Sequence, residues 1–136
     1  MRLFLDSSVL LAASGSVAGA SRSLIMSASR EERTLLTSGY CVCEVEHNIR
    51  KLGPKAAQSW QWVILPRLKV GATSLVLDRP LVYRAVKDRP VVIAALSLRS
   101  DYLLTLDRDD FHDLLGLSVY GLPIRTPGEF LRETKR

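Results

Sequence analysis

The sequence predicts an α/β fold in which helices cover a mainly parallel β-sheet. Short apolar runs of strand length alternate along the chain with segments whose apolar residues have helical spacing. Helical segments between strands are typical of connections that let neighbouring strands run parallel. The length of 136 residues and the composition, 47% hydrophobic and 24% charged, suit a globular chain with one core. We therefore expect a single domain over residues 1–136.

The first half of the chain is expected to hold two strands and four helices. Apolar runs predict strands at residues 2–5 and 34–38, and helical spacing predicts helices at residues 8–14, 19–30, 40–52 and 54–65. The first strand ends at Asp6, and a sharp turn leads into the first helix. Val45 and Ile49 share one face of the third helix, which Gly53 and Pro54 are expected to stop.

The second half is expected to hold three strands and two helices. The predicted strands are residues 73–77, 101–105 and 118–120, and the predicted helices are residues 88–100 and 129–136. Asp88 opens the first of these helices and Pro90 lies in its first turn. This helix is apolar on nearly every side, which predicts burial between two layers. Gly121 and Pro123 predict a turn after the last strand.

The charge of the chain favours a polyanionic partner. The net charge is +5 and the pI is near 9.6, and basic side chains that neutralise phosphates release counterions on binding. No apolar stretch approaches the roughly 20 residues that span a bilayer, and Asp6 interrupts the N-terminal apolar run too early for a signal peptide. We expect a cytoplasmic protein without a membrane partner. Cys41 and Cys43 are expected to be reduced, and they form half of a zinc site at best.

Four acidic residues stand out by their positions. Asp6 and Asp107 follow predicted strands, Asp88 begins a helix, and Glu44 lies inside another helix. Helix capping explains each aspartate taken singly, and a solvated surface position explains Glu44 or Glu46, between which helical periodicity does not choose. The carboxyl ends of parallel strands meet at one edge of a sheet, where repulsion within such a set is offset by a divalent cation or by raised pKa values. Carboxylate oxygens suit Mg²⁺ or Mn²⁺, which can activate water against a phosphodiester.

Several segments, in this order, resemble the PIN-domain ribonucleases, many of which are VapC-type toxins of bacterial toxin–antitoxin pairs. The matching segments are LFLDSSVLLAA, GASRSLI, LLTSGYCVCEVEHNIRK, KDRPVVIAAL, YLLTLDRDDF and IRTPGEFL. The resemblance spans nearly the whole chain and implies a three-layer α/β/α sandwich with a mainly parallel central sheet. It also places Ser38 on the serine that precedes the glutamate-bearing helix.

The resemblance implies a catalytic site made of the four acids. Asp6, Glu44, Asp88 and Asp107 would be the catalytic residues and the ligands of Mg²⁺ or Mn²⁺, with Glu44 chosen over Glu46. Around them, Ser7 and Thr105 would hydrogen-bond the carboxylates or a water, and Asp110 would orient metal-bound water. Two positions depart from the family pattern, because Leu106 stands where many relatives have glycine and Arg89 with Pro90 stands where small apolar residues are common.

The function implied is metal-dependent hydrolysis of single-stranded or structured RNA by the toxin of a toxin–antitoxin pair. A cognate antitoxin and a homodimer are the protein partners that the resemblance implies. The phosphate contacts we expect are the basic residues near the acids in sequence, namely Arg22, Arg50, Lys51, Lys87 and Arg89. The main alternative is a catalytically inactive PIN-like module that binds RNA or protein. A magnesium phosphohydrolase with a nucleophilic aspartate is less favoured, because Ser8 stands where a second aspartate is usual.

Overall fold

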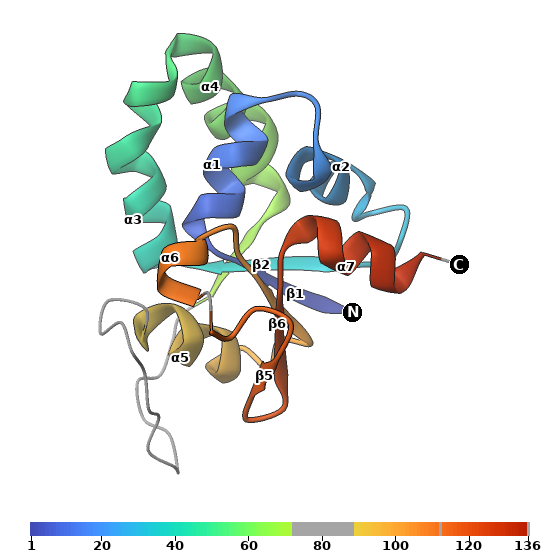
Figure 1. The fold of residues 1–136 in the computed structure, drawn as a ribbon. Helices are drawn as coiled ribbons and strands as arrows, with labels where there is room; N and C mark the ends of the chain where they lie inside the picture. Colours follow the sequence, from blue (N-terminus) through green and yellow to red (C-terminus); the bar gives the residue numbers. More distant parts are fainter. Residues whose placement is uncertain (72–88, 112, 136) are drawn as a thin grey trace.

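The structure is a computed structural model that describes residues 1–71, 89–111 and 113–135. In this part of the chain, six strands form one sheet with helices on both faces (Figure 1). The strands are β1 (Arg2–Leu5), β2 (Thr34–Ser38), β3 (Lys69–Gly71), β4 (Tyr102–Leu104), β5 (Ser118–Val119) and β6 (Leu122–Arg125). Their order across the sheet is β3-β2-β1-β4-β6-β5.

Strand β1 lies inside the sheet and pairs in parallel with both of its neighbours. Its register joins Leu3 to Leu35 of β2 and to Tyr102 of β4. The pairs β2–β3 and β4–β6 are also parallel, and among the described strands only β5 pairs antiparallel, with β6. The arrangement confirms the predicted α/β fold with a mainly parallel sheet. The chain moves outward from β1 through β2 to β3 and then returns to β4, so the strand order reverses between β1 and β4.

Alternating residues of the strands build a core on each face of the sheet. Leu3 and Leu5 of β1 point into a cluster beneath the first helices, whereas Phe4 between them points into a second cluster on the other face. All three side chains are fully buried. This period of two follows from the pleat of a strand, and it explains why β1 is apolar throughout, as parallel strands covered on both faces are.

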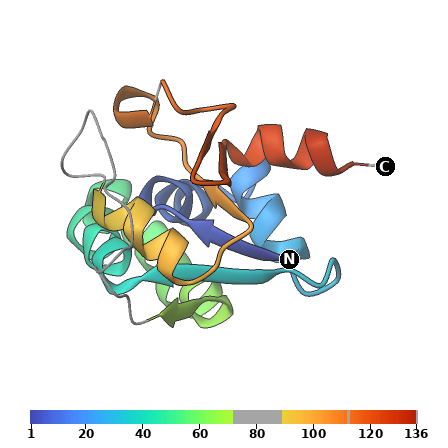
Figure 2. The same ribbon diagram turned by 90° about the horizontal axis from the view of Figure 1, so that it is seen from below.

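Most helices lie on the face that Leu3 and Leu5 cover. These are α1 (Ser7–Gly15), α2 (Ala20–Ser27), α3 (Gly39–Asn48), α4 (Pro54–Ser59) and α7 (Pro127–Thr134). Helix α5 (Arg89–Ser97) lies across the opposite face, as the view from below shows (Figure 2). The buried valines and alanines of α5 pack on Phe4 and Leu103. The predicted three-layer arrangement is therefore present.

Local chemistry sets the ends of several helices. Ser38 caps α3, because its Oγ accepts a hydrogen bond of 3.2 Å from the Cys41 N–H. The helix predicted for residues 40–52 ends as an α-helix at Asn48 and continues as a 3₁₀ turn, Ile49–Leu52, which Gly53 closes with a φ of 97°. Helix α4 passes into a π-helical turn, Trp60–Ile64, and then a 3₁₀ turn, Leu65–Arg67.

The structure adds three elements that the sequence patterns did not predict. Strand β3 is short and largely exposed, so it lacks an apolar signal and is held by backbone pairing with β2. Strand β6 includes Pro123, which we expected in a turn; the flanking Leu122 and Ile124 are buried and explain the strand. A four-residue helix, α6 (Arg108–Phe111), follows β4. The strand predicted at 73–77 lies outside the described residues.

Among the described residues, no single helix has the length and apolar character needed to cross a bilayer. Helices α1 and α2 have the required length and apolar composition only when taken together, and the chain bends by 95° between them.

Candidate active site

Three elements that begin at the carboxyl edge of the sheet position the candidate site. Helix α1 starts directly after β1, α3 starts directly after β2, and a short loop from β4 leads to α6. Figure 1 shows α1, α3 and α6 gathered at this edge. The reversal of strand order between β1 and β4 lies here, and in open α/β sheets such a point is the usual place of a ligand site.

Asp6 is a buried acid that several hydrogen bonds hold in place. It follows β1 directly, and 5% of its surface is exposed. Its Oδ2 atom accepts hydrogen bonds from Thr105 Oγ1 at 2.8 Å and from Ser8 Oγ at 3.0 Å. Its backbone N–H donates to the carbonyl of Leu104 at 3.0 Å. Asp6 is the N-cap residue of α1, yet its side chain makes no capping hydrogen bond. The capping explanation that the sequence allowed is therefore insufficient for Asp6.

The environment of Asp6 suits a carboxylate that binds a cation. Burial raises the pKa of Asp6 above the ordinary value of 3.8, and the hydrogen bonds from the Thr105 and Ser8 hydroxyls, together with the nearby backbone N–H groups of Ser7 and Ser8, oppose this rise. A nearby cation would favour the charged form in the same way and would offset the cost of burial.

Hydroxyl groups connect Asp6 to the loop that follows β4. The Leu106 N–H donates to Ser8 Oγ at 2.9 Å, and the Asp107 N–H donates to Thr105 Oγ1 at 3.1 Å. The two hydroxyl oxygens are 3.3 Å apart. Ser8 and Thr105 therefore fix the carboxylate of Asp6 and the backbone that carries Asp107 as one unit.

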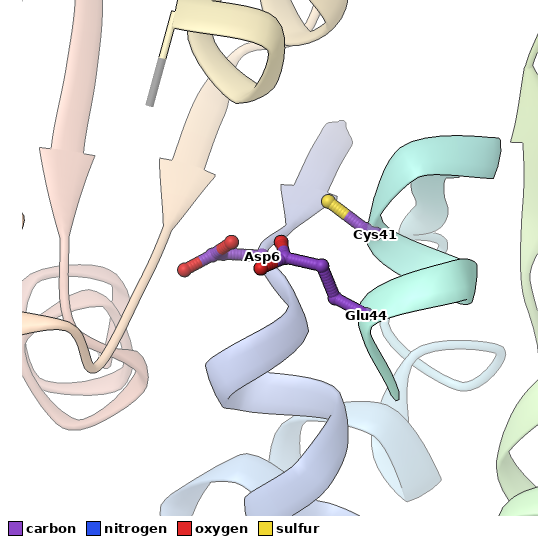
Figure 3. A group of neighbouring side chains, drawn as sticks. All are labelled: Asp6, Cys41 and Glu44. Carbon is purple, nitrogen blue, oxygen red and sulfur yellow. The ribbon is translucent and has the colours of Figure 1, made fainter. Parts of the chain in front are cut away.

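Glu44 reaches the same site from α3. Its side chain is half-buried, and its Oε1 accepts a hydrogen bond of 3.2 Å from Ser7 Oγ. Figure 3 shows the Glu44 side chain extending from α3 toward Asp6. Glu46, two residues later, is exposed. The structure thus places Glu44, and not Glu46, beside Asp6. Helical periodicity did not choose between these two acids, whereas the family resemblance favoured Glu44.

Cys41 is a third side chain in this group. One potential ligand atom from each of Asp6, Cys41 and Glu44 lies within 4.8 Å of the others (Figure 3). Burial raises the pKa of the Cys41 thiol to about 11, and the charge of Asp6 adds to this effect, whereas the Ser38 and Thr37 hydroxyls act in the opposite direction. The thiol therefore keeps its proton near neutral pH when no cation is bound.

The other predicted acids are described less fully. Asp107 lies three residues after β4, and its side chain is half-buried. Asp88 lies outside the described residues, and so does the side chain of Asp110. Leu106 stands where the resemblance to PIN-domain proteins led us to expect glycine, and it is 38% exposed. Its backbone N–H donates a hydrogen bond to Ser8 Oγ.

The predicted phosphate contacts whose side chains the structure describes fall into two groups. Arg22 is half-buried, and its Nη1 donates to the carbonyl of Ala13 at 2.8 Å and to Ser59 Oγ at 2.7 Å. It therefore joins α1, α2 and α4. Arg50 and Lys51 are exposed on the 3₁₀ turn after α3. Lys87 and the side chain of Arg89 lie outside the described residues.

Sequence reasoning missed two members of the site. Ser8 was noted only because it stands where a phosphohydrolase usually has a second aspartate. Cys41 was noted only because it and Cys43 could supply half of a zinc site. Cys41 precedes Glu44 by three residues, so both share one face of a helix, and this spacing was a usable signal. No comparable signal marks Ser8, because its contacts with Thr105 and Leu106 join residues 97 and 98 positions apart.

The donor atoms fit a divalent cation. Asp6 and Glu44 offer two carboxylates from two elements, at the edge of the sheet rather than in its core. Mg²⁺ and Mn²⁺ are commonly bound by one or two carboxylates and otherwise by water, so this pair meets the requirement.

Comparison with known proteins bears on the fold. No family model matches the sequence. No curated protein sequence matches it either. Among solved structures, the chain is similar to the crystal structure of VapBC2 from Rickettsia felis bound to a DNA fragment from their promoter. The identity is 15%, the match covers 93% of this chain and 98% of that chain, and the TM-score is 0.62. At this identity, the similarity shows a shared fold.

Proposed function

Since the chain has a PIN-like fold, as its likeness to VapBC2 shows, we propose that it is a metal-dependent endoribonuclease. Its substrate would be single-stranded or structured RNA, and the bond hydrolysed a phosphodiester. The observation that carries the proposal is the meeting of Asp6 and Glu44 at the reversal of strand order. A buried carboxylate beside a second acid is costly, a bound cation would offset that cost, and a chain of net charge +5 attracts RNA.

Each residue of the site has a part in this proposal. Asp6, Glu44 and Asp107 would hold Mg²⁺ or Mn²⁺, together with Asp88. A divalent cation held there supplies activation of water and neutralisation of the charge that develops on the phosphate.

The neighbouring side chains would position these ligands. Ser8 and Thr105 orient Asp6, and Ser7 orients Glu44. Asp110 would orient the attacking water. Loss of a group that hydrogen-bonds a metal ligand in this way typically lowers metal affinity or activity by roughly 10 to 100-fold.

Basic side chains near the site would hold the RNA backbone. Arg50 and Lys51 are exposed on the turn after α3, six and seven residues beyond Glu44, so they would contact phosphates about 10 Å from the reacting group on that side. In the sequence, Lys87 comes shortly before α5 and Arg89 is the first residue of α5. Both would add contacts with the RNA backbone. Arg22 would act mainly through its hydrogen bonds to Ala13 and Ser59.

The likeness to VapBC2 also supports a place in a toxin–antitoxin pair. The matched structure is that of VapBC2 on promoter DNA, and the sequence resembles VapC-type toxins. We therefore propose that this chain acts in the cytoplasm as the toxin of such a pair, forms a homodimer and binds a cognate antitoxin. Copurification with the product of an adjacent small gene, followed by light scattering, would test the partner and the oligomeric state.

The test of the enzymatic proposal is cleavage of a labelled single-stranded RNA by protein freed of any partner. Reactions contain Mg²⁺, Mn²⁺ or EDTA. Asp6→Asn and Asp107→Asn should abolish metal-dependent cleavage. Glu46→Gln and Asp109→Asn are matched controls, since both acids are exposed and lie near the site in sequence. Native protein that binds RNA but never cuts it would instead support the inactive binding module.

A further inference from the structure

Cys41 lies where the core meets the candidate active site. Its side chain is fully buried and packs with Phe4, Leu36 and Val92 in the cluster beneath α5. Its sulfur also lies within 4.8 Å of carboxylate oxygens of Asp6 and Glu44. The proposed hydrolysis uses the two acids but assigns no part to the sulfur. An aliphatic side chain would fill the same core position without placing a lone pair beside the acids.

The three side chains together make a mixed set of donors. Carboxylates alone favour Mg²⁺ or Mn²⁺, whereas a sulfur ligand shifts preference toward thiophilic cations such as Zn²⁺. Cysteine sulfur and carboxylate oxygen are both zinc ligands, and catalytic zinc sites commonly have three protein ligands and one water. Asp6, Cys41 and Glu44 provide three such ligands from two elements.

We propose that Asp6, Cys41 and Glu44 form a second, inhibitory mode of metal binding in which a thiophilic divalent cation, Zn²⁺, occupies the site. This inference rests on the proposed ribonuclease function, because it assigns a regulator to the same two carboxylates. Zn²⁺ held by the sulfur would exclude Mg²⁺ or Mn²⁺ from Asp6 and Glu44 and would stop RNA hydrolysis.

The binding step balances without any redox partner. The zinc–sulfur bond replaces the S–H bond of Cys41, and the thiol proton passes to water. Zinc bonds of about 2.0 to 2.3 Å place tetrahedral ligands roughly 3.5 Å apart, so the three atoms, which lie within 4.8 Å of one another, must approach by up to about 1.3 Å. Glu44 can make this movement, because its side chain is half-buried and long, whereas Asp6 is held by Thr105 and Ser8.

Two cations serve as probes of the full chain in the absence of RNA. The chain has two cysteines, and Cys43 is exposed on the same helix, so Cys43→Ser is the matched control and leaves Cys41 as the remaining thiol. Cys41→Ser and Cys41→Ala are then made in the Cys43→Ser background. The first keeps the size of the side chain, and the second removes the donor. Melting temperatures establish that each variant folds.

Titration with Cd²⁺ should give the ultraviolet charge-transfer band of a cadmium–thiolate bond in Cys43→Ser, and neither Cys41 variant should give it. Zn²⁺ affinity, measured by competition with a chromophoric chelator, should fall roughly tenfold or more in both Cys41 variants, since even groups that only support a ligand contribute 10 to 100-fold. A Cys43→Ser protein without the band, or one that binds Zn²⁺ no more tightly than its Cys41→Ala derivative, would overturn the zinc site and leave Cys41 as a core residue.

RNA cleavage separates this inference from the proposed function. The ratio of Mn²⁺-dependent rates with and without added Zn²⁺ should be low in Cys43→Ser and should rise in the Cys41 variants. Cleavage with Mn²⁺ by a protein that shows no cadmium band would uphold the ribonuclease and reject the zinc site. A cadmium band in a protein that never cuts RNA would uphold the zinc site and reject the ribonuclease.

Discussion

Thr105, the residue after β4, donates a hydrogen bond of 2.8 Å to the buried carboxylate of Asp6, the residue after β1. Neither group is exposed to bulk water, because Thr105 is fully buried and Asp6 nearly so. The bond therefore joins two neighbouring strands through their side chains at the point where the strand order reverses.

Thr105→Val should destabilise the fold, because it keeps the shape of the side chain but removes a donor from a buried carboxylate. The expected loss in free energy of unfolding at neutral pH is about 1 to 3 kcal/mol. Urea unfolding, monitored by circular dichroism, measures it. Ser29→Ala is the control, since Ser29 is exposed before the amino end of β2 and should change stability little. Equal stability of Thr105→Val and native protein would contradict the importance assigned to this bond.

Asp6→Asn should stabilise the metal-free protein at neutral pH. The folded state raises the pKa of Asp6, so it binds the proton more tightly than the unfolded state does. Stability from this group is therefore present at low pH and is lost as pH rises past the ordinary value of 3.8 and through the folded pKa. The gain in Asp6→Asn should appear above that value and vanish below it. Unfolding measured in EDTA across pH checks the sign, and a pH-independent difference would refute it.

Mg²⁺ or Mn²⁺ should raise the melting temperature of the native chain. A ligand at about 100 times its dissociation constant adds roughly 2.7 kcal/mol to the free energy of unfolding. The shift should be absent in Asp6→Asn and Glu44→Gln and preserved in Glu46→Gln, whose acid is exposed two positions away from Glu44. Differential scanning fluorimetry with and without metal provides the measurement. Equal shifts in all four proteins would mean that the cation binds elsewhere.

Removal of a phosphate contact should change the salt dependence of RNA binding. Arg50→Ala and Lys51→Ala should each weaken binding across unrelated RNA sequences and lower the slope of log K against log salt by roughly 0.7, the value per phosphate of a single strand. Fluorescence anisotropy with Asp6→Asn as the background avoids cleavage. Arg30→Ala is the control, because this exposed arginine lies before β2, at the amino ends of the strands. A slope unchanged from the background would remove that residue from the RNA-binding surface.

The sequence supported the fold because the necessary signals are local. The apolar runs of β1, β2 and β4 predicted strands, and the helical segments between strands predicted that these strands run parallel. The acids that follow β1 and β4 were therefore expected at one edge of the sheet. The resemblance to PIN-domain proteins is confirmed for the fold. Strand β3 could not be predicted from the sequence, because its residues are mostly exposed and its conformation comes from pairing with β2.

The site was predictable in part. Asp6 and Glu44 were named in advance, yet their proximity depends on how α1 and α3 pack, which no local pattern reports. The role of Ser8 could not be predicted for the same reason. Its hydroxyl forms hydrogen bonds with Asp6 and with the loop after β4 only once the strands have paired. Cys41 was judged by its spacing from Cys43, whereas the relevant neighbour is Glu44, one helical turn away on the same face.

The hydrogen bond between Asp6 and Thr105 also determines at which stage of chain synthesis the complete site can form. The two residues are 99 positions apart, so a chain emerging from the ribosome carries Asp6 and Glu44 long before it carries Thr105. Contacts of such separation form late, because a long loop must close before they gain any energy. A growing chain therefore lacks the complete arrangement until β4 has been made and has paired with β1. Under the proposed function, RNA hydrolysis would begin only after that pairing.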